Sequence, residues 1–65
     1  MDKLLLDAKI KECGLKYSYV AKKLGISEAA FVRKRQGNIP FKVSEIKILR
    51  DILNLSDREV GKLFL

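Results

Sequence analysis

The side chains with the clearest chemical potential in this sequence are basic, and they are gathered in the middle of the chain. Residues 16–42 contain seven Lys or Arg side chains and a single acid, Glu28, whereas residues 1–15 and 43–65 each carry no net charge. The whole net charge of +6 therefore lies in the middle segment. A solvated face that keeps the protein soluble would account for such charge, but segregation this complete favours a surface that binds a polyanion.

Residues that perform enzyme chemistry are scarce. The chain has no His, the commonest general base, and one cysteine, Cys13. These residues cannot form a metal-binding set of the usual spacing, and an internal disulfide is excluded. Cys13 could be a reactive thiol, but a small core residue near the end of the first helix is the favoured interpretation. We therefore expect no enzymatic activity, no cofactor or metal and no small-molecule ligand.

The elements that carry the charges are expected to be helices, because the chain has one proline and shows little strand-like alternation. An apolar content of 48% suits one small globular domain over residues 1–65. No apolar run approaches the length of about 18 residues that a membrane span needs. The first helix is predicted over residues 2–12 or 2–13, ended by Gly14, with Leu6, Ile10 and Cys13 on its buried face and Leu5 beside them.

The stretch VAKKLGISEAAFVRKRQG, residues 20–37, predicts two helices separated by an abrupt turn. The second helix should span about 17–24 and end at Gly25, which can adopt the left-handed conformation that the turn requires. Ser27 is a good N-cap for a third helix that runs to about residue 36. The residues expected to face inward are Val20, Ala21, Leu24, Ala30 and Phe31, with Ile26 between the helices. Two helices joined in this way at a steep angle form a helix-turn-helix, here at about residues 17–36.

Two more helices are predicted after the loop at residues 37–41. The fourth should span about 43–53, with Asn54 as a left-handed cap and Leu55 folded back onto the core. The sequence SDRE at 56–59 has the pattern of a capping box and therefore starts a short fifth helix. The residues expected to be buried on these helices are Ile46, Leu49, Leu53, Val60, Leu63 and Phe64, with Ile52 beside them.

The pattern resembles the phage Cro and lambda-repressor family of helix-turn-helix proteins. The resemblance lies in VAKKLGIS (20–27), Phe31, Gly37 and EIKILRDILNLSDREV (45–60), and it covers roughly residues 4–65. Small Cro-like proteins of phages and prophages of Gram-positive bacteria are the most similar subgroup. The resemblance implies an all-α, five-helix, lambda-repressor-like domain that binds a double-stranded DNA operator. It also implies a transcriptional repressor in the cytoplasm of the bacterial host, at the nucleoid.

The resemblance assigns roles to individual residues. Base contacts would come from Ser27, Glu28, Ala29, Val32 and Arg33. Contacts with the DNA backbone would come from Lys16, Tyr17, Ser18, Gln36, Asn38 and Lys42. Arg33 could form a bidentate pair with guanine, whereas Glu28 could accept from a cytosine amino group or simply favour the helix dipole.

Two lysines stand where many relatives have a Ser or Thr N-cap. Lys16 precedes the second helix and Lys42 precedes the fourth, and a lysine cannot accept the free backbone N–H groups of a helix end. We expect each lysine to pair with a phosphate instead. In the alternative interpretation, Ser18 and Ser44 cap shorter helices and the lysines are only solvated.

The two basic residues after Arg33 also depart from the family pattern. Arg35 is expected to reach back to Asp7 or Glu12 on the first helix, or to face solvent. Lys34 stands at a position that is often apolar, and it is expected to extend across the edge of the core. Neither residue is therefore counted among the base readers.

Other functions stay open from the sequence. A protein-interaction module, such as an antirepressor or an adaptor, would suit the small apolar residues Ala29, Ala30 and Val32, although the clustered charge argues against it. Binding of structured RNA is less favoured, because no strand surface with aromatic side chains for base stacking is evident. A homodimer, complete in solution or only on DNA, is expected because one small domain reads few base pairs. Phe64 is expected in the core, whereas Leu65 could be exposed at a dimer contact.

Overall fold

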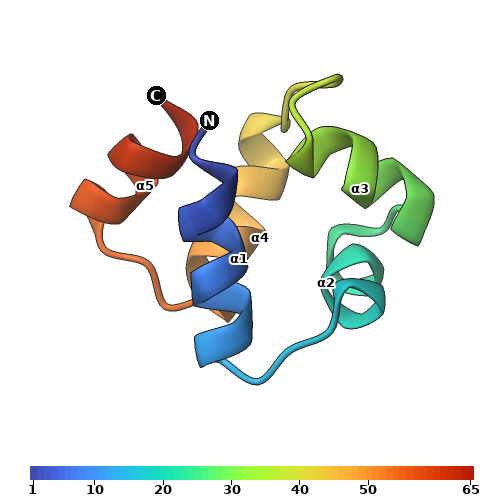
Figure 1. Cartoon of the computed structure of the whole chain (residues 1–65), viewed down its shortest axis with the longest axis horizontal. Coiled ribbons are helices and arrows are strands. Elements are labelled where there is room, and N and C mark those ends of the chain that lie inside the picture. The colour runs from blue at the N-terminus through green and yellow to red at the C-terminus, as the bar shows by residue number, and fades with distance from the viewer.

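The computed structural model describes all 65 residues and contains five α-helices and no strand. The helices are α1 (Lys3–Glu12), α2 (Tyr17–Leu24), α3 (Glu28–Arg35), α4 (Val43–Ile52) and α5 (Asp57–Phe64). In Figure 1, α1 and α4 lie in the middle, with α5 on one side and α2 and α3 on the other. None of the five helices has both the length and the apolar character needed to cross a membrane. The all-helical prediction is confirmed, and each helix begins and ends close to its predicted bounds.

Three of the helices begin at a side-chain cap. The carboxylate of Asp2 accepts a backbone N–H of the first turn of α1 (3.0 Å), and Ser27 Oγ does the same in α3 (3.1 Å). At α5 the predicted capping box is present: Ser56 Oγ accepts from the N–H of Glu59 (3.1 Å), whose carboxylate accepts from the N–H of Ser56 (3.0 Å). Each cap stabilises its helix by about 0.5–2 kcal/mol, so local sequence determines where these helices start.

A single residue reverses the direction of the chain after α4. Asn54 has a φ of +52° and is the one residue other than glycine with a positive φ. A short polar side chain tolerates this left-handed conformation better than most. The reversal turns Leu55 into the core, where it is 5% exposed, as predicted.

Ten buried hydrophobic side chains, drawn from all five helices and from the segment after α4, form the core. Phe31 of α3 is fully buried, with its ring 5.3 Å from that of Tyr17 and 6.0 Å from that of Phe41. The ring of Phe41 in turn faces Phe64 of α5 at 5.6 Å. This row of aromatic rings ties α2, α3, the loop before α4 and α5 together. Phe64 packs against the core as expected, and Leu65 is fully exposed.

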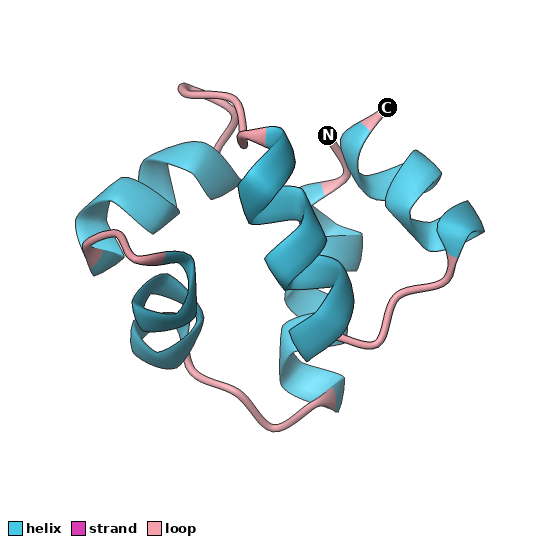
Figure 2. Cartoon of the chain, turned by 180° about the vertical axis from the view of Figure 1, so that it is seen from behind, coloured by secondary structure: helices cyan, strands magenta, loops and turns pink.

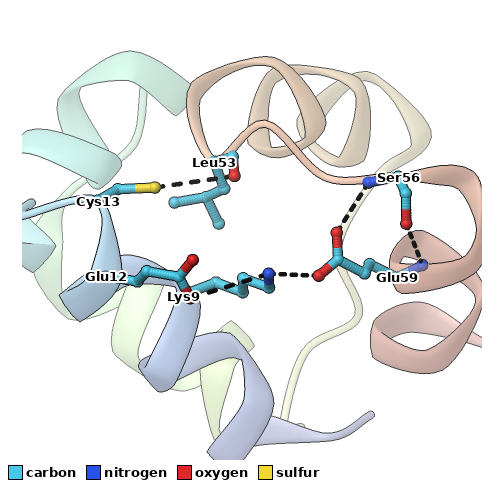
Figure 3. A network of polar contacts seen from close by, with 6 residues as sticks. All are labelled: Lys9, Glu12, Cys13, Leu53, Ser56 and Glu59. Atoms are coloured by element: carbon cyan, nitrogen blue, oxygen red, sulfur yellow. Dashed lines mark hydrogen bonds and ion pairs between the residues drawn. The ribbon is translucent and has the colours of Figure 1, made fainter.

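Three predicted inward positions are corrected by the structure. Cys13 is exposed because it is the C-cap of α1, beyond the last helical residue and directly before the turn at Gly14; its thiol lies 3.7 Å from the carbonyl oxygen of Leu53 (Figure 3). Ala30 and Ile46 are only half-buried and lie outside the core cluster, whereas Val60, also half-buried, packs against it. Glu45 takes the buried place at the start of α4. Helical periodicity gives the direction of a side chain, but not whether another element covers it.

A polar cluster joins α1 to α5. The ammonium of Lys9 pairs with the carboxylate of Glu59 and lies 3.9 Å from that of Glu12, one turn further along α1 (Figure 3). The hydrogen bond from Lys9, with that from the N–H of Ser56, holds the pKa of Glu59 below its ordinary value. One carboxylate therefore both caps α5 and holds it against α1.

Candidate nucleic-acid interface

The turn between α2 and α3 is closed by backbone hydrogen bonds around Gly25. This residue has a φ of +73°; its N–H donates to the carbonyl of Lys22 (3.1 Å), and the N–H of Ile26 donates to that of Ala21 (3.1 Å). These two bonds form the Schellman motif, which ends a helix at a left-handed residue. Ser27 then caps α3 directly. Figure 1 views α2 nearly along its axis while α3 lies across the view, so the two helices cross steeply.

The residues predicted to contact bases lie on the solvent side of α3. Exposed residues are Ser27, Glu28, Ala29 and Arg33, and Val32 is half-buried. The Ser27 hydroxyl accepts the capping N–H of α3, and its proton stays free to be donated. These five side chains are therefore accessible from one face, while their contacts with DNA remain a prediction.

Lys34 does not share the exposed face with Arg33. Its Nζ lies 2.6 Å and 2.7 Å from the two carboxylate oxygens of Glu45 on α4, and both side chains are buried. Burial raises the pKa of Glu45, but the hydrogen bonds from Lys34 and from the N–H of Lys42 outweigh it and bring the pKa below its ordinary value. Lys34 thus enters the core edge as expected, and its acidic partner is a finding of the tertiary structure.

Arg35 points back to α1, where it pairs with Asp7. Its Nε donates to Asp7 Oδ1 (2.7 Å), its terminal N–H group contacts the other carboxylate oxygen, and the Tyr17 hydroxyl donates to the same carboxylate. The hydrogen bond from Arg35 lowers the pKa of Asp7, and Asp7 in turn raises the pKa of Arg35. Of the alternatives considered for Arg35, pairing with Asp7 is confirmed. One cluster therefore ties α1, α2 and α3 together.

Five basic side chains of the middle segment remain outside any ion pair. They are Lys16, Lys22, Lys23, Arg33 and Lys42, and all are exposed. The Nζ of Lys23 lies 5.6 Å from the centre of the Tyr19 ring, which is itself exposed. Because two of the seven cations are paired with acids, the free positive charge of this surface comes from five side chains.

Helices α2 and α4 begin without a side-chain cap. Their N-cap residues are Lys16 and Lys42, and neither side chain forms a capping hydrogen bond. Both helices begin directly after these lysines, so the alternative in which Ser18 and Ser44 cap shorter helices is wrong. A lysine side chain has no acceptor atom and its charge opposes the helix dipole, so each end costs about 1 kcal/mol relative to a Ser or Thr cap.

The uncapped ends leave backbone N–H groups open. They belong to residues 17–19 of α2 and 43–45 of α4, and the protein provides an acceptor for none of them. A helix N-terminus with free N–H groups and a neighbouring lysine is a favourable place for a phosphate. Both ends lie beside α3, because the Tyr17 ring packs on Phe31 and Glu45 bonds to Lys34.

The residues predicted to contact the DNA backbone come from three places around α3. Lys16, Tyr17 and Ser18 begin α2, Gln36 and Asn38 follow α3, and Lys42 precedes α4. All are exposed except Tyr17, whose hydroxyl is engaged by Asp7, so its backbone N–H is the group left for a phosphate. Figure 2 shows the loop between α3 and α4 projecting from the end of the molecule.

Acid is expected to weaken the fold, because three paired carboxylates have lowered pKa values. They belong to Asp7, Glu45 and Glu59. Their stabilisation is complete above the unfolded-state pKa values, at about 4, and is lost as the pH falls through the lower folded-state values. Since the chain has no His, the urea midpoint should be constant from about pH 7 to pH 5 and fall from about pH 4 to pH 2. In the Asp7→Asn variant the urea midpoint should fall less steeply between about pH 4 and pH 2. An equally steep fall would show that the Asp7 carboxylate does not contribute to the pH dependence of stability.

Known proteins give no independent guide to this surface. Comparisons with protein-family models, with curated proteins and with solved structures found no match to the chain. The resemblance to Cro and lambda repressor therefore rests on the residues that carry it. The charges and helix ends around α3 are the basis for a functional proposal.

Proposed function

We propose that this protein binds double-stranded DNA sequence-specifically through a helix-turn-helix formed by α2, the turn at residues 25–27 and α3, within a lambda-repressor-like fold. The proposal rests on the side chains and helix ends that lie on and beside α3. Its exposed face bears the unpaired Arg33, and two uncapped helix ends, each with a lysine, lie beside it. Phosphates satisfy free N–H groups, lysines and a helix dipole at once, and in a duplex they border the groove that a helix enters.

In this proposal α3 lies in the major groove, which admits an α-helix. Arg33 would donate to the O6 and N7 of a guanine, and no ion pair within the protein must break first. Glu28 would accept from a cytosine amino group, and Ala29 and Val32 would contact a thymine methyl. The Ser27 hydroxyl would donate to a base or a nearby phosphate.

A single copy is too short to read two half-sites. The Cα atoms extend over 27 × 24 × 20 Å, whereas half-sites one helical turn apart are separated by about 34 Å. Reading a two-fold symmetric operator therefore requires a second copy, bound through the same surface of both chains.

One end of the molecule has the composition of a contact between copies. Two of the exposed large hydrophobic side chains, Met1 and Ile39, line one groove together with Ile46 and Phe64. Exposed apolar side chains gathered at one place favour association, and this groove joins the N-terminus, the loop before α4 and the end of α5. A dimer through this groove would leave Arg33 and the uncapped end of α2 free for DNA, whereas the uncapped end of α4 adjoins the groove.

Occupying an operator would exclude RNA polymerase from an overlapping promoter. We therefore propose a Cro-type transcriptional repressor of a phage or prophage as the biological role, acting at the nucleoid of the bacterial host. Nothing in this role requires a cofactor, a metal or a small-molecule ligand.

Selection from a random double-stranded DNA library, with sequencing, tests the proposal at near-physiological salt. An enriched motif with two-fold symmetry and half-sites about one helical turn apart would support a DNA-reading dimer. Enrichment of one short site would support DNA reading by a monomer. Weak, salt-sensitive binding without any enriched motif would contradict the proposal and favour a protein-interaction module.

Lys16→Thr should make the protein more stable and its DNA binding weaker. A threonine hydroxyl can accept a hydrogen bond from a backbone N–H of α2 that has no acceptor in the wild type, so the free energy of unfolding should rise by about 1 kcal/mol. The slope of log Kobs against log salt concentration should become shallower by about 0.9, because one phosphate contact is lost. Urea unfolding and anisotropy titrations at several salt concentrations measure the two effects, with Lys62→Thr on α5 as control. Higher stability with an unchanged salt slope would show that Lys16 does not contact a phosphate of the DNA.

A further inference from the structure

The carboxylate of Glu45 connects α3 to the first turn of α4. Both of its oxygens accept from Lys34 Nζ, and Oε1 also accepts from the backbone N–H of Lys42 at 2.8 Å. Lys34 and Glu45 are the two buried charged residues of the protein, with exposed fractions of 7% and 5%. The Glu45 side chain therefore contacts both the last turn of α3 and the N-cap residue of α4.

The pair is poorly explained as a source of stability. Removing two charges from water costs free energy that their attraction barely repays, so an apolar pair of similar volume is often as stable or more stable. The surroundings are apolar: Lys34 shares a groove with Ile39, Phe41 and Ile46. The pair is also satisfied internally, since no buried side-chain nitrogen or oxygen lacks a partner. The ion pair differs from apolar contacts in being directional. Its hydrogen bonds fix the relative orientation of the two side chains, which apolar contacts do not.

We propose that Lys34 and Glu45 are positioning residues for DNA binding, which hold the first turn of α4 in a fixed place beside α3. This inference rests on the proposed function of α3. Glu45 occupies the N–H of Lys42, while the N–H groups of residues 43–45 and the Lys42 side chain stay open for a phosphate. Lys34 holds the carboxylate in place from the helix that reads the bases. The backbone contact at α4 and the base contacts at α3 are thereby kept at a constant separation.

Two double variants separate positioning from stability. Lys34→Met with Glu45→Met replaces the ion pair by apolar side chains, and the protein should keep or gain stability. Lys34→Glu with Glu45→Lys restores an ion pair in reverse, but a lysine at position 45 cannot accept from the N–H of Lys42. Both variants should bind the selected DNA about tenfold more weakly or worse, because a charge-assisted contact at α4 is misplaced. The control is Lys9→Met with Glu59→Gln, which removes the ion pair between α1 and α5 and leaves an acceptor for the cap of α5.

A second readout does not depend on DNA. Amide hydrogen exchange of the free protein should show faster exchange at the N–H of Lys42 in both double variants, with unchanged exchange in the core helices. Weaker DNA binding together with faster exchange at Lys42, at undiminished stability, would support the positioning role. Wild-type DNA affinity in either double variant would overturn it, and so would unchanged protection of Lys42. If the wild-type protein selects no DNA, the proposed function fails, and the exchange at Lys42 alone decides whether the pair holds the start of α4.

Discussion

Replacing Phe31 with alanine is expected to leave most molecules unfolded at 25 °C. The side chain is fully buried, and its ring packs between those of Tyr17 and Phe41. Removing a buried Phe ring costs about 3–5 kcal/mol. A single core in a chain of this length supplies only about 3–5 kcal/mol of net stability, so one cavity at the centre can cancel it.

Urea unfolding followed by far-ultraviolet circular dichroism measures this loss. Tyr19→Ala is the matched control, because it removes an aromatic ring from an exposed position of α2. It should cost less than about 1 kcal/mol. A folded Phe31→Ala variant with a midpoint close to that of the wild type would show that the ion pairs of Lys34 and Arg35 suffice to hold α3.

Replacing Arg33 with alanine is expected to weaken binding to the selected operator by roughly 5- to 150-fold, the equivalent of about 1–3 kcal/mol for a bidentate pair with guanine. Arg33 is exposed and forms no ion pair, so the free energy of unfolding should change by less than about 0.5 kcal/mol. Repeating the library selection with the variant should remove the preference for guanine at one position of each half-site and leave the other positions unchanged.

Arg58→Ala on α5 controls for the general loss of charge. Arg58 is exposed, its removal changes the net charge by the same amount, and α5 lies on the other side of the molecule from α3 (Figure 1). Both variants are titrated with the same DNA at the same salt concentration. Equal losses would mean that Arg33 acts only through the general electrostatic attraction, and wild-type binding by Arg33→Ala would exclude it as a base reader.

Three consecutive basic residues end α3, and the structure gives each a different environment. Arg33 faces solvent, Lys34 is buried against Glu45, and Arg35 pairs with Asp7. Successive side chains of a helix point about 100° apart, so neighbours in sequence meet different parts of the protein. A count of charges therefore overstates the surface that DNA could contact.

The positions of the helices and of their ends follow from local sequence. Ser27, Ser56, Gly25 and Asn54 act on backbone groups within a few residues, so their effect is readable without knowing the fold. For the same reason, the lysines at the two remaining helix starts can be identified from the sequence as residues unable to cap a helix. Apolar spacing likewise identified most of the core, including the fully buried Phe31.

Which helix faces pack together, and which charged side chains form ion pairs, depends on contacts between residues far apart in the sequence. Lys34 and Glu45 are 11 residues apart, and Asp7 and Arg35 are 28 apart. Such pairs form because separate helices pack at particular angles, and no local pattern encodes that packing. The same reason applies to Cys13, whose spacing matches a buried stripe although its side chain is exposed. Local interactions specify each helix, whereas burial and ion pairing depend on all five helices together.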